Sequence, residues 1–502
     1  MTLFPRPTPV SATGSTRSSR RDGEGTVEDI INSLGMGYAQ VVIIALAFGV
    51  WFADGVELAF TVALTPAISK DLMLDGTQRA TLASLVFCGM GFGCGVGGVA
   101  GDRFGRRYPI LCGYLAVAAA QLTCSCITGF EHLAFLRFCL GVGMGTAMPP
   151  SLALTKEFCP ENWRVFLMGL RATILMLGEV LGASMVYADD PYLVDLHWRY
   201  LLALGAIPPA IIGCLALAFL RESPVYLDNC GCHSEAKSVL EWVRLKNNAS
   251  EAVEYPSTCT ADSEYGSTFT RMRSRTSSVE IGLTSVQVLV GRHLAFSTAV
   301  LFLLCFTLNL IEYGTAYAEP TIFLLVSSPS TPGRQLVTKY GTAAIVRTLM
   351  LVPTVLLGRR SSVKLGLASI FFGLVIFVMM GSLQAPGHPG LAFIYRCSLW
   401  LQVAGVSLVS VPLYILSVEI YPVALAATGS AISVGGGRIG STVAPFLFES
   451  MKSWQHFYLL LAAMSALGLL LFSLLPDPQE TKELADADLQ LVGAETEPLT
   501  KQ

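Results

Sequence analysis

The chain contains 502 residues, of which 53% are hydrophobic and only 14% carry a charge at neutral pH. Soluble domains carry about a quarter of their residues as charged side chains, so a water-soluble enzyme, a disordered chain and a collagen-like fibre are excluded. A formal net charge of −3 gives no basis for binding nucleic acid.

Charged residues are concentrated in segments 1–36, 221–292 and 477–502, which together hold about half of them. The rest of the chain is too apolar for a water-exposed surface, and a lipid bilayer is the solvent that fits it. Segment 1–36 has no apolar run near its start, so we expect a tail and no signal peptide. The 13 cysteines lie mostly within apolar runs, and we expect no disulfide framework, metal or other cofactor.

Twelve apolar runs are long enough to cross a bilayer, which takes about 20 mostly apolar residues. They lie near 38–60, 80–99, 108–128, 132–153, 165–187, 200–220, 294–318, 335–357, 364–383, 392–416, 428–448 and 455–475. We therefore predict an all-α membrane protein with twelve transmembrane helices in two six-helix pseudo-repeats. The predicted parts are a disordered cytosolic N-terminal tail (1–36), a first half (37–220), a cytosolic central loop (221–292), a second half (293–476) and a cytosolic C-terminal tail (477–502).

The two halves carry matching motifs. Pro150 precedes Glu157 by seven residues in the first half, as Pro412 precedes Glu419 in the second. A Gly-Arg-Arg triplet also follows helix 2 at 105–107 and helix 8 at 358–360. Internal repeats of this kind are typical of secondary transporters, which bind their substrate between the repeats near the bilayer midplane.

Basic residues at the helix ends predict the orientation, because cytosolic loops carry an excess of Lys and Arg. Loops 2–3, 4–5 and 8–9 and the ends of the central loop carry this excess, through Arg103, Arg106, Arg107, Lys156, Arg164, Arg221, Arg292, Arg359, Arg360 and Lys364. We therefore expect both termini and the central loop on the cytosolic side of the plasma membrane or of an intracellular vesicle membrane.

Helix 1 carries two carboxylates, Asp54 and Glu57, which are three residues apart and so lie on one helical face. A charge inside the bilayer is costly, and it usually faces a cavity, pairs with another group or carries protons. We favour a role in proton coupling or substrate binding for at least one of them. The alternative is a structural pair bonded to neighbouring helices.

The second half carries two intramembrane cations, Arg347 in helix 8 and Arg438 in helix 11. Their planar guanidinium groups suit the carboxylate of an anionic substrate. Arg347 is expected near mid-membrane, about 16 Å from the end of its helix at 1.5 Å per residue. For Arg438, a structural pairing with Glu312, Glu419 or Glu449 is an equal alternative. Arg171 in helix 5 is expected at the gate.

The most specific motif lies between helices 2 and 3, where residues 98–107 read GVAGDRFGRR. Carboxylate and guanidinium groups at the ends of two helices can form charge-assisted hydrogen bonds in one conformation and release them in another. The motif resembles the loop 2–3 signature of the major facilitator superfamily, and the resemblance covers about residues 38–476. The alternative is that these bases only anchor the helix ends at the cytosolic surface.

The resemblance implies a cytosolic gate that closes in the outward-open state. Asp102 would face the second half, and Arg106 or Arg107 would pair with Glu157 and Glu222. The implied gate residues are Gly98, Asp102, Arg103, Gly105, Arg106, Arg107, Glu157, Arg164, Glu222 and Glu419. The second half departs from the family pattern, with Val355 in place of an acid and Ala426 in place of an arginine, so the gate is expected to depend mainly on first-half charges.

Further motifs are similar to the sugar-porter and organic-ion-transporter branches, namely RFCLGVGMG at 137–145 and RESP at 221–224. The sequences DGVE at 54–57 and EYG at 312–314 resemble the synaptic-vesicle-protein-related group. The expected substrate or proton-coupling residues are Asp54, Glu57, Arg137, Glu312, Tyr313, Arg347 and Arg438.

We predict a proton-coupled secondary active transporter, not an enzyme, that moves a small organic anion or zwitterion as a symporter and acts as a monomer. Sugars and organic cations are alternatives, since acidic residues in helices 1 and 7 suit a cation equally well. Another alternative is a non-transporting membrane protein with the same fold and a binding or regulatory role. An ATP-driven pump is disfavoured, because the sequence has no GxxxxGK[ST] loop.

Overall fold

The structure is a computed structural model that describes residues 26–248, 294–326, 332–383, 389–420 and 426–476. All regular secondary structure within these ranges is helical. Residues 1–25, the central-loop residues 249–292 and the predicted tail 477–502 lie outside the described ranges.

The first half contains six spans. They are α2 (Tyr38–Asp71), α3 (Gly76–Phe104), α4 (Arg107–Cys124), α5 (Phe130–Phe158), α6 (Glu161–Asp189) and the pair α7 (Trp198–Gly205) and α8 (Ile207–Phe219). The sixth span is interrupted at Ala206, two residues before Pro208. Proline has no backbone N–H for the preceding turn, so a new helix starts there more readily than the old one continues.

The second half repeats this plan. It contains α13 (Ala295–Val326), α14 (Pro332–Leu349) with α15 (Leu351–Leu357), α16 (Arg359–Ser382), α17 (Pro389–Glu419), α18 (Ala426–Ser450) and α19 (Trp454–Ser473). In the described part, nine helices are long and apolar enough to cross a membrane by length and composition. The helix α4, the pair α14–α15 and α18 complete the twelve predicted spans, so the predicted fold class is confirmed.

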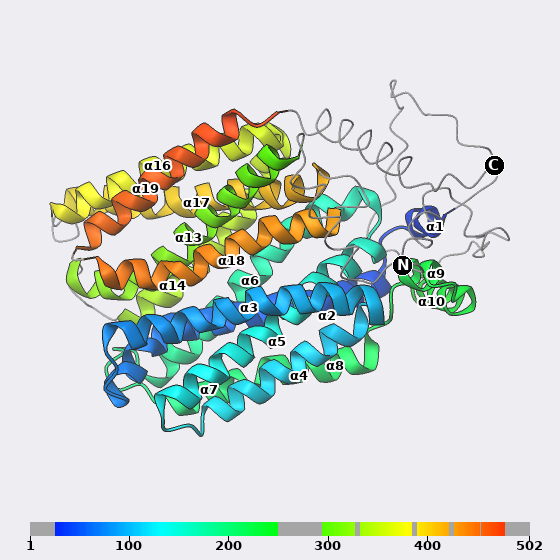
Figure 1. The fold of residues 1–502 in the computed structure, drawn as a ribbon, viewed down its shortest axis with the longest axis horizontal. Helices are drawn as coiled ribbons and strands as arrows, with labels where there is room; N and C mark the ends of the chain where they lie inside the picture. Colours follow the sequence, from blue (N-terminus) through cyan, green and yellow to red (C-terminus); the bar gives the residue numbers. More distant parts are fainter. Residues whose placement is uncertain are drawn as a thin grey trace, which may run out of the picture.

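The halves lie side by side, with the second half above the first in Figure 1. They meet where α3 packs against α18 and where α6 packs against α14. The short helices α1 (Val27–Leu34), α9 (Pro224–Asn229) and α10 (His233–Lys246) gather at one end of the bundle, at the right of Figure 1. We call this end the α1 face and the other end the opposite face.

Helix α1 corrects the prediction of a wholly disordered tail over 1–36. Thr26 and Asp29 form a capping box, in which the Thr26 hydroxyl accepts from the Asp29 amide and the Asp29 carboxylate accepts from the Thr26 amide. Val27 and Ile31 are one turn apart and bury their side chains against Leu240 of α10. The helix therefore forms because its start is capped and its apolar stripe has a surface to cover.

The first part of the central loop is also folded, and it is bonded to the first transmembrane helix. The Asn247 side chain accepts from the backbone amide of Ala39 at 3.0 Å and donates to Gln40 Oε1 at 2.7 Å. Asn247 thus supplies a hydrogen-bond acceptor to the start of α2, where the first backbone amides have no partner within the helix.

Glycines let the helices within each half approach closely. A Cβ atom added at Gly93 of α3 would lie 2.3 Å from the carbonyl oxygen of Val142 in α5, and one added at Gly145 would lie 2.2 Å from that of Met90. Glycine is required here because only it leaves room for the facing backbone, as is common between membrane helices. Gly440 of α18 meets Phe306 of α13 in the same way in the second half.

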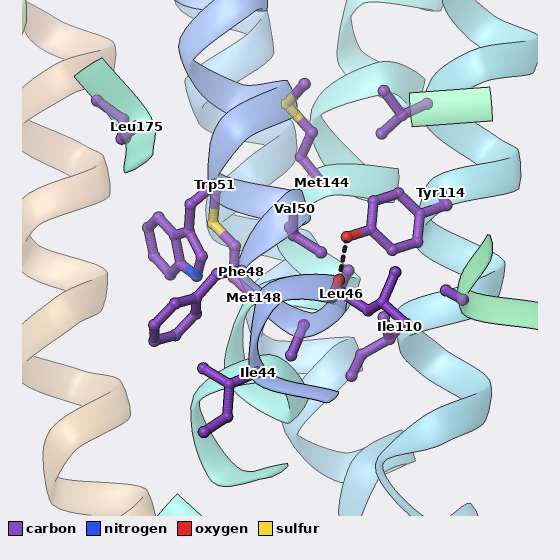
Figure 2. Packing of buried hydrophobic residues seen from close by; sticks show 14 of the residues in the cluster. Ile44, Leu46, Phe48, Val50, Trp51, Ile110, Tyr114, Met144, Met148 and Leu175 are labelled. Atoms are coloured by element: carbon purple, nitrogen blue, oxygen red, sulfur yellow. Dashed lines mark hydrogen bonds between the residues drawn. The ribbon is translucent and has the colours of Figure 1, made fainter. Parts of the chain in front are cut away.

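Large side chains fill the space around these close contacts. Figure 2 shows Trp51, Tyr114 and Met144 among the buried residues of the first half. The Tyr114 hydroxyl donates to the carbonyl oxygen of Leu46 at 2.6 Å, which satisfies the polar end of the ring and joins α4 to α2. Each half is therefore a tightly packed body.

We expect Gly93→Ala to destabilise the protein, because the added Cβ has backbone on the other side and cannot be accommodated by a side-chain rotation. The loss should be about 1–3 kcal/mol, the usual cost of overpacking. Thermal unfolding in detergent will measure it. The matched control is Gly95→Ala on the same helix, where a Cβ would meet nothing within 4 Å. Equal effects of the two substitutions would contradict the close-packing role of Gly93.

Candidate functional site

Glu57 of α2 is fully buried and hydrogen-bonded. It forms an ion pair with Arg137 of α5, and both side chains are almost inaccessible to solvent. Gln121 Nε2 donates to its carboxylate at 2.8 Å and the Thr61 hydroxyl at 3.1 Å. With three donors, Glu57 has the environment of the structural pair that the sequence left as an alternative.

Asp54 lies one turn before Glu57 and has a different environment. It is only 2% exposed, and its Oδ2 atom is buried without a hydrogen-bond partner in the described part of the chain. The charges that act on it most strongly are those of Arg438, Glu57 and Arg171. A buried polar atom without a partner costs about 1–3 kcal/mol, and a bound proton or a substrate donor would offset that cost.

Arg438 of α18 reaches across from the second half. Its guanidinium group donates to the Met148 sulfur at 3.2 Å and to the Met90 sulfur and the Tyr313 hydroxyl at 3.5 Å. None of the described carboxylates accepts a hydrogen bond from Arg438, and Glu312 and Glu449 are bonded to other residues. These neutral, weak acceptors leave most of its hydrogen-bonding capacity available to an anion.

Arg171 of α6 lies between two aromatic rings from different halves. Its guanidinium carbon is 4.2 Å from the centre of the Trp51 ring in α2 and 5.4 Å from that of Tyr414 in α17. Cation–π contacts of this kind stabilise a cation and leave its N–H groups free at the edge. Arg171, which we expected at the gate, therefore lies near Asp54 together with Arg438. We call Asp54, Arg171 and Arg438 the central group.

A second group of intramembrane charges joins α13 and α14 of the second half with α6 of the first. Arg347 of α14 forms an ion pair with Glu312 of α13. Glu179 of α6 is only 2% exposed and interacts electrostatically with Arg347 and with Lys339. Glu179 is not among the residues predicted from the sequence, although a lone acid inside the apolar run 165–187 is itself a sign of function.

At the α1 face, a charge cluster connects α3, α4 and α5 of the first half. Arg106 donates from Nε and Nη2 to the Glu157 carboxylate at 3.1–3.3 Å and from Nη1 to the Gly101 carbonyl at 2.7 Å. Its guanidinium group also stacks on Tyr226, 4.7 Å from the ring centre. Burial raises the pKa of the Tyr226 hydroxyl to about 12, so the hydroxyl keeps its proton and donates to the Arg103 carbonyl at 3.0 Å.

Glu222 has a structural role beside this cluster. Its carboxylate accepts from the backbone amides of Arg106 at 2.8 Å and Arg107 at 3.2 Å, and so caps the start of α4. Gly105 precedes these amides with φ +92°, a conformation that favours glycine, and an added Cβ would lie 2.3 Å from Glu222. The motif glycine and the distant acid therefore form one turn.

Other predicted gate residues are placed separately. Arg107 donates to the Leu217 carbonyl at 3.0 Å, and Arg164 lies 3.7 Å from Glu28 of α1. Gly98 lies on α3 with nothing within 4 Å of an added Cβ. The side chains of Asp102 and Glu419 lie outside the described part of the structure.

We expect Glu57→Gln to destabilise the protein far more than Asp54→Asn. Glu57→Gln leaves the buried Arg137 charge without its partner, which costs about 3–5 kcal/mol. Asp54→Asn keeps the volume and removes no hydrogen bond formed by the described residues. Thermal unfolding in detergent compares the two. Adding Arg137→Met to Glu57→Gln should recover part of the loss, and equal losses in both single variants would contradict the distinction.

The profile of the Sugar (and other) transporter family matches residues 40–484. The 4-hydroxybenzoate transporter PcaK of Acinetobacter baylyi is 31% identical over 199 residues, which are 39% of this chain and 43% of the relative. The organic cation/carnitine transporter 7 of Arabidopsis thaliana is 24% identical over 467 residues, 86% of this chain and 89% of the relative. Synaptic vesicle glycoprotein 2B of Rattus norvegicus is 28% identical over 231 residues, 44% of this chain and 34% of the relative.

Solved structures agree in fold. The partially occluded inward open conformation of the xylose transporter XylE from E. coli superimposes with a TM-score of 0.67, at 16% identity, over 88% of this chain and 100% of that chain. The family profile covers most of the sequence, including both halves and the loop 2–3 motif. The chain therefore belongs to the sugar (and other) transporter family of the major facilitator superfamily, as its motifs predicted.

Proposed function

We propose that this protein is a secondary active transporter that carries a small organic anion together with protons by alternating access. The observation that carries the proposal is the environment of Asp54. The Oδ2 atom of this buried carboxylate has no hydrogen-bond partner in the described part, and the carboxylate lies within the fields of Arg171 and Arg438. Neither arginine donates to a described carboxylate.

Charge balance explains why a proton and an anion would bind together. Glu57 pairs with Arg137, Glu312 pairs with Arg347, and Glu179 lies in the fields of Arg347 and Lys339. Arg171 and Arg438 are then the two guanidinium groups that act on Asp54. An ionised Asp54 offsets one of these charges, whereas a protonated Asp54 leaves both for a substrate carboxylate. Because unbalanced charge is costly inside the membrane, proton binding to Asp54 favours anion binding to Arg438. This coupling corresponds to symport.

The aromatic side chains around Arg171 and Arg438 favour an organic anion with a flat ring. Trp51 and Tyr414 flank Arg171, and the rings of Phe87 and Tyr313 lie with their centres 4.7 Å apart close to Arg438. An aromatic carboxylate would place its charge on a guanidinium group and its ring among these side chains. The name of the 4-hydroxybenzoate transporter relative supports the same substrate class.

The site is built from both halves, as alternating access requires. Asp54, Trp51 and Arg171 come from the first half, and Tyr313, Tyr414 and Arg438 come from the second. A rocking motion of the halves would change the distance between Asp54 and Arg438, and with it the competition between carboxylate and substrate for the guanidinium group. In this proposal the α1 face is cytosolic and the Arg106–Glu157 cluster belongs to the cytosolic gate.

Uptake by proteoliposomes tests the substrate class. The probes are 4-hydroxybenzoate, carnitine and xylose, each with and without a pH gradient that is alkaline inside. We expect 4-hydroxybenzoate to accumulate only with the gradient, because its carboxylate suits Arg438 and Arg171. Accumulation of carnitine or xylose instead would show that the substrate is a zwitterion or a sugar and not an organic anion. Correctly folded protein that takes up none of the three would favour a non-transporting role.

Asp54→Asn should abolish gradient-driven accumulation and preserve the exchange of labelled for unlabelled substrate, since exchange needs no net proton movement. Binding of 4-hydroxybenzoate should tighten as pH falls in the unmodified protein, because the proton on Asp54 releases Arg438. In Asp54→Asn this pH dependence should be lost. Equilibrium binding between pH 5 and 8 will measure both. Full accumulation by Asp54→Asn would eliminate Asp54 as the proton carrier.

Arg438→Gln is the companion variant. The loss of a charge-assisted hydrogen bond should weaken 4-hydroxybenzoate binding about tenfold, which corresponds to about 1.4 kcal/mol, and should change the binding of neutral 4-hydroxybenzamide little. The control is Arg347→Gln, which breaks the ion pair with Glu312. It should lower the yield of folded protein but change the binding of 4-hydroxybenzoate and 4-hydroxybenzamide to the same extent. Equal weakening of both probes in Arg438→Gln would assign that arginine to structure.

A further inference from the structure

Three helices meet at the opposite face through a charged contact. Arg79 lies in the first turn of α3, Glu449 in the last turn of α18 and Tyr317 in α13. Arg79 donates to both carboxylate oxygens of Glu449, from Nε at 2.8 Å and from Nη2 at 2.7 Å. The Tyr317 hydroxyl donates to Glu449 Oε1 at 2.9 Å.

This contact joins the two halves. Arg79 belongs to the first half, whereas Glu449 and Tyr317 belong to the second, and α3 and α18 pack along each other. Two other ion pairs near this face, Arg199 with Asp71 and Lys70 with Asp195, stay within the first half. The Arg79–Glu449 pair is therefore broken by a separation of the halves, and the other two pairs are not.

The position of Glu449 needs a partner from outside its own helix. A carboxylate in the last turn of a helix lies at the negative end of the helix dipole, which disfavours it. Here the carboxylate also lies at the start of α3, since a Cβ added at Gly76 would be 3.2 Å from Glu449 Oε2. The positive end of α3 and the Arg79 guanidinium group together compensate for the unfavourable end of α18.

The exposure of the pair suits a contact that opens and closes. The Arg79 side chain is 37% exposed and that of Glu449 is 18% exposed. Water can therefore hydrate both charges when the halves separate. The Glu57–Arg137 pair, by contrast, is buried within one half, and its separation would leave two charges without water inside the membrane.

We propose that Arg79, Glu449 and Tyr317 form a latch that holds the halves together at the opposite face and opens when the central site becomes accessible from that face. This inference rests on the proposed transport function for its place in a cycle. The latch is closed in the present structure. Its loss should raise the fraction of molecules in which a solute can reach Arg438 from the opposite face.

Cys94 provides the measurement, because its thiol lies beside Arg438. In a variant that keeps Cys94 as its single cysteine, a membrane-impermeant maleimide is added from the opposite face, with sidedness fixed by a C-terminal tag. Glu449→Gln and Arg79→Gln should each raise the labelling rate about two- to fivefold, the range for losing a partly exposed ion pair. Tyr317→Phe should give a smaller rise. High salt should raise the unmodified rate and leave that of Glu449→Gln nearly unchanged.

Two controls keep the test specific. Asp71→Asn breaks an ion pair with Arg199 at the same face but within one half, and should leave labelling unchanged. The double variant Arg79→Glu with Glu449→Arg should restore the unmodified rate. The latch proposal is contradicted if Glu449→Gln and Tyr317→Phe keep the thermal stability of the unmodified protein and their Cys94 is labelled at the same rate as in Asp71→Asn.

The outcome also separates the latch from the transport function, since labelling needs no substrate. Faster labelling of Glu449→Gln in a protein that accumulates no solute would support the latch and count against transport. Proton-driven accumulation with unchanged labelling in every latch variant would support transport and overturn the latch.

Discussion

The membrane interior offers no water to a charged side chain, and the arrangement of the buried charges follows from this constraint. Glu57 receives three hydrogen-bond donors, and Arg347 is held by Glu312. Asp54 departs from this pattern, because its Oδ2 atom has no partner among the described residues although it lies only one turn from Glu57. A fold that satisfies one acid and leaves its neighbour without a hydrogen bond keeps that neighbour available for a ligand or a proton.

Packing within the halves differs from packing between them. Inside a half, glycines such as Gly93 and Gly145 bring backbones into direct contact, so helices cannot slide without a clash. Between the halves, side-chain ends make contacts such as the hydrogen bond between the hydroxyl groups of Thr173 and Thr348, and the Gly333 amide donates to the Pro191 carbonyl at 2.9 Å. Two tightly packed bodies with few polar contacts through backbone atoms between them are suited to a rocking motion.

Sequence periodicity and composition predicted the twelve spans, because a run of about 20 apolar residues has few other uses. Periodicity and composition could not predict hydrogen bonds between residues that lie far apart in the chain. Asp54 and Glu57 look equivalent in sequence, and only the fold shows that Arg137, 80 positions later, bonds to Glu57. Helix α1 was overlooked because its apolar stripe is short, although the Thr26–Asp29 capping box was readable.

The hydrogen bonds of Asn247 bear on how the protein is made. Asn247 lies 208 positions after Ala39, so the start of the first transmembrane helix gains this acceptor only after all six spans of the first half and α10 have been synthesised. The residues that complete the hydrogen bonding at the start of α2 therefore extend beyond residue 220 to Asn247. A fragment that ends after α8 would lack the Asn247 acceptor for the Ala39 amide. A fragment that includes α10 and Asn247 would keep it.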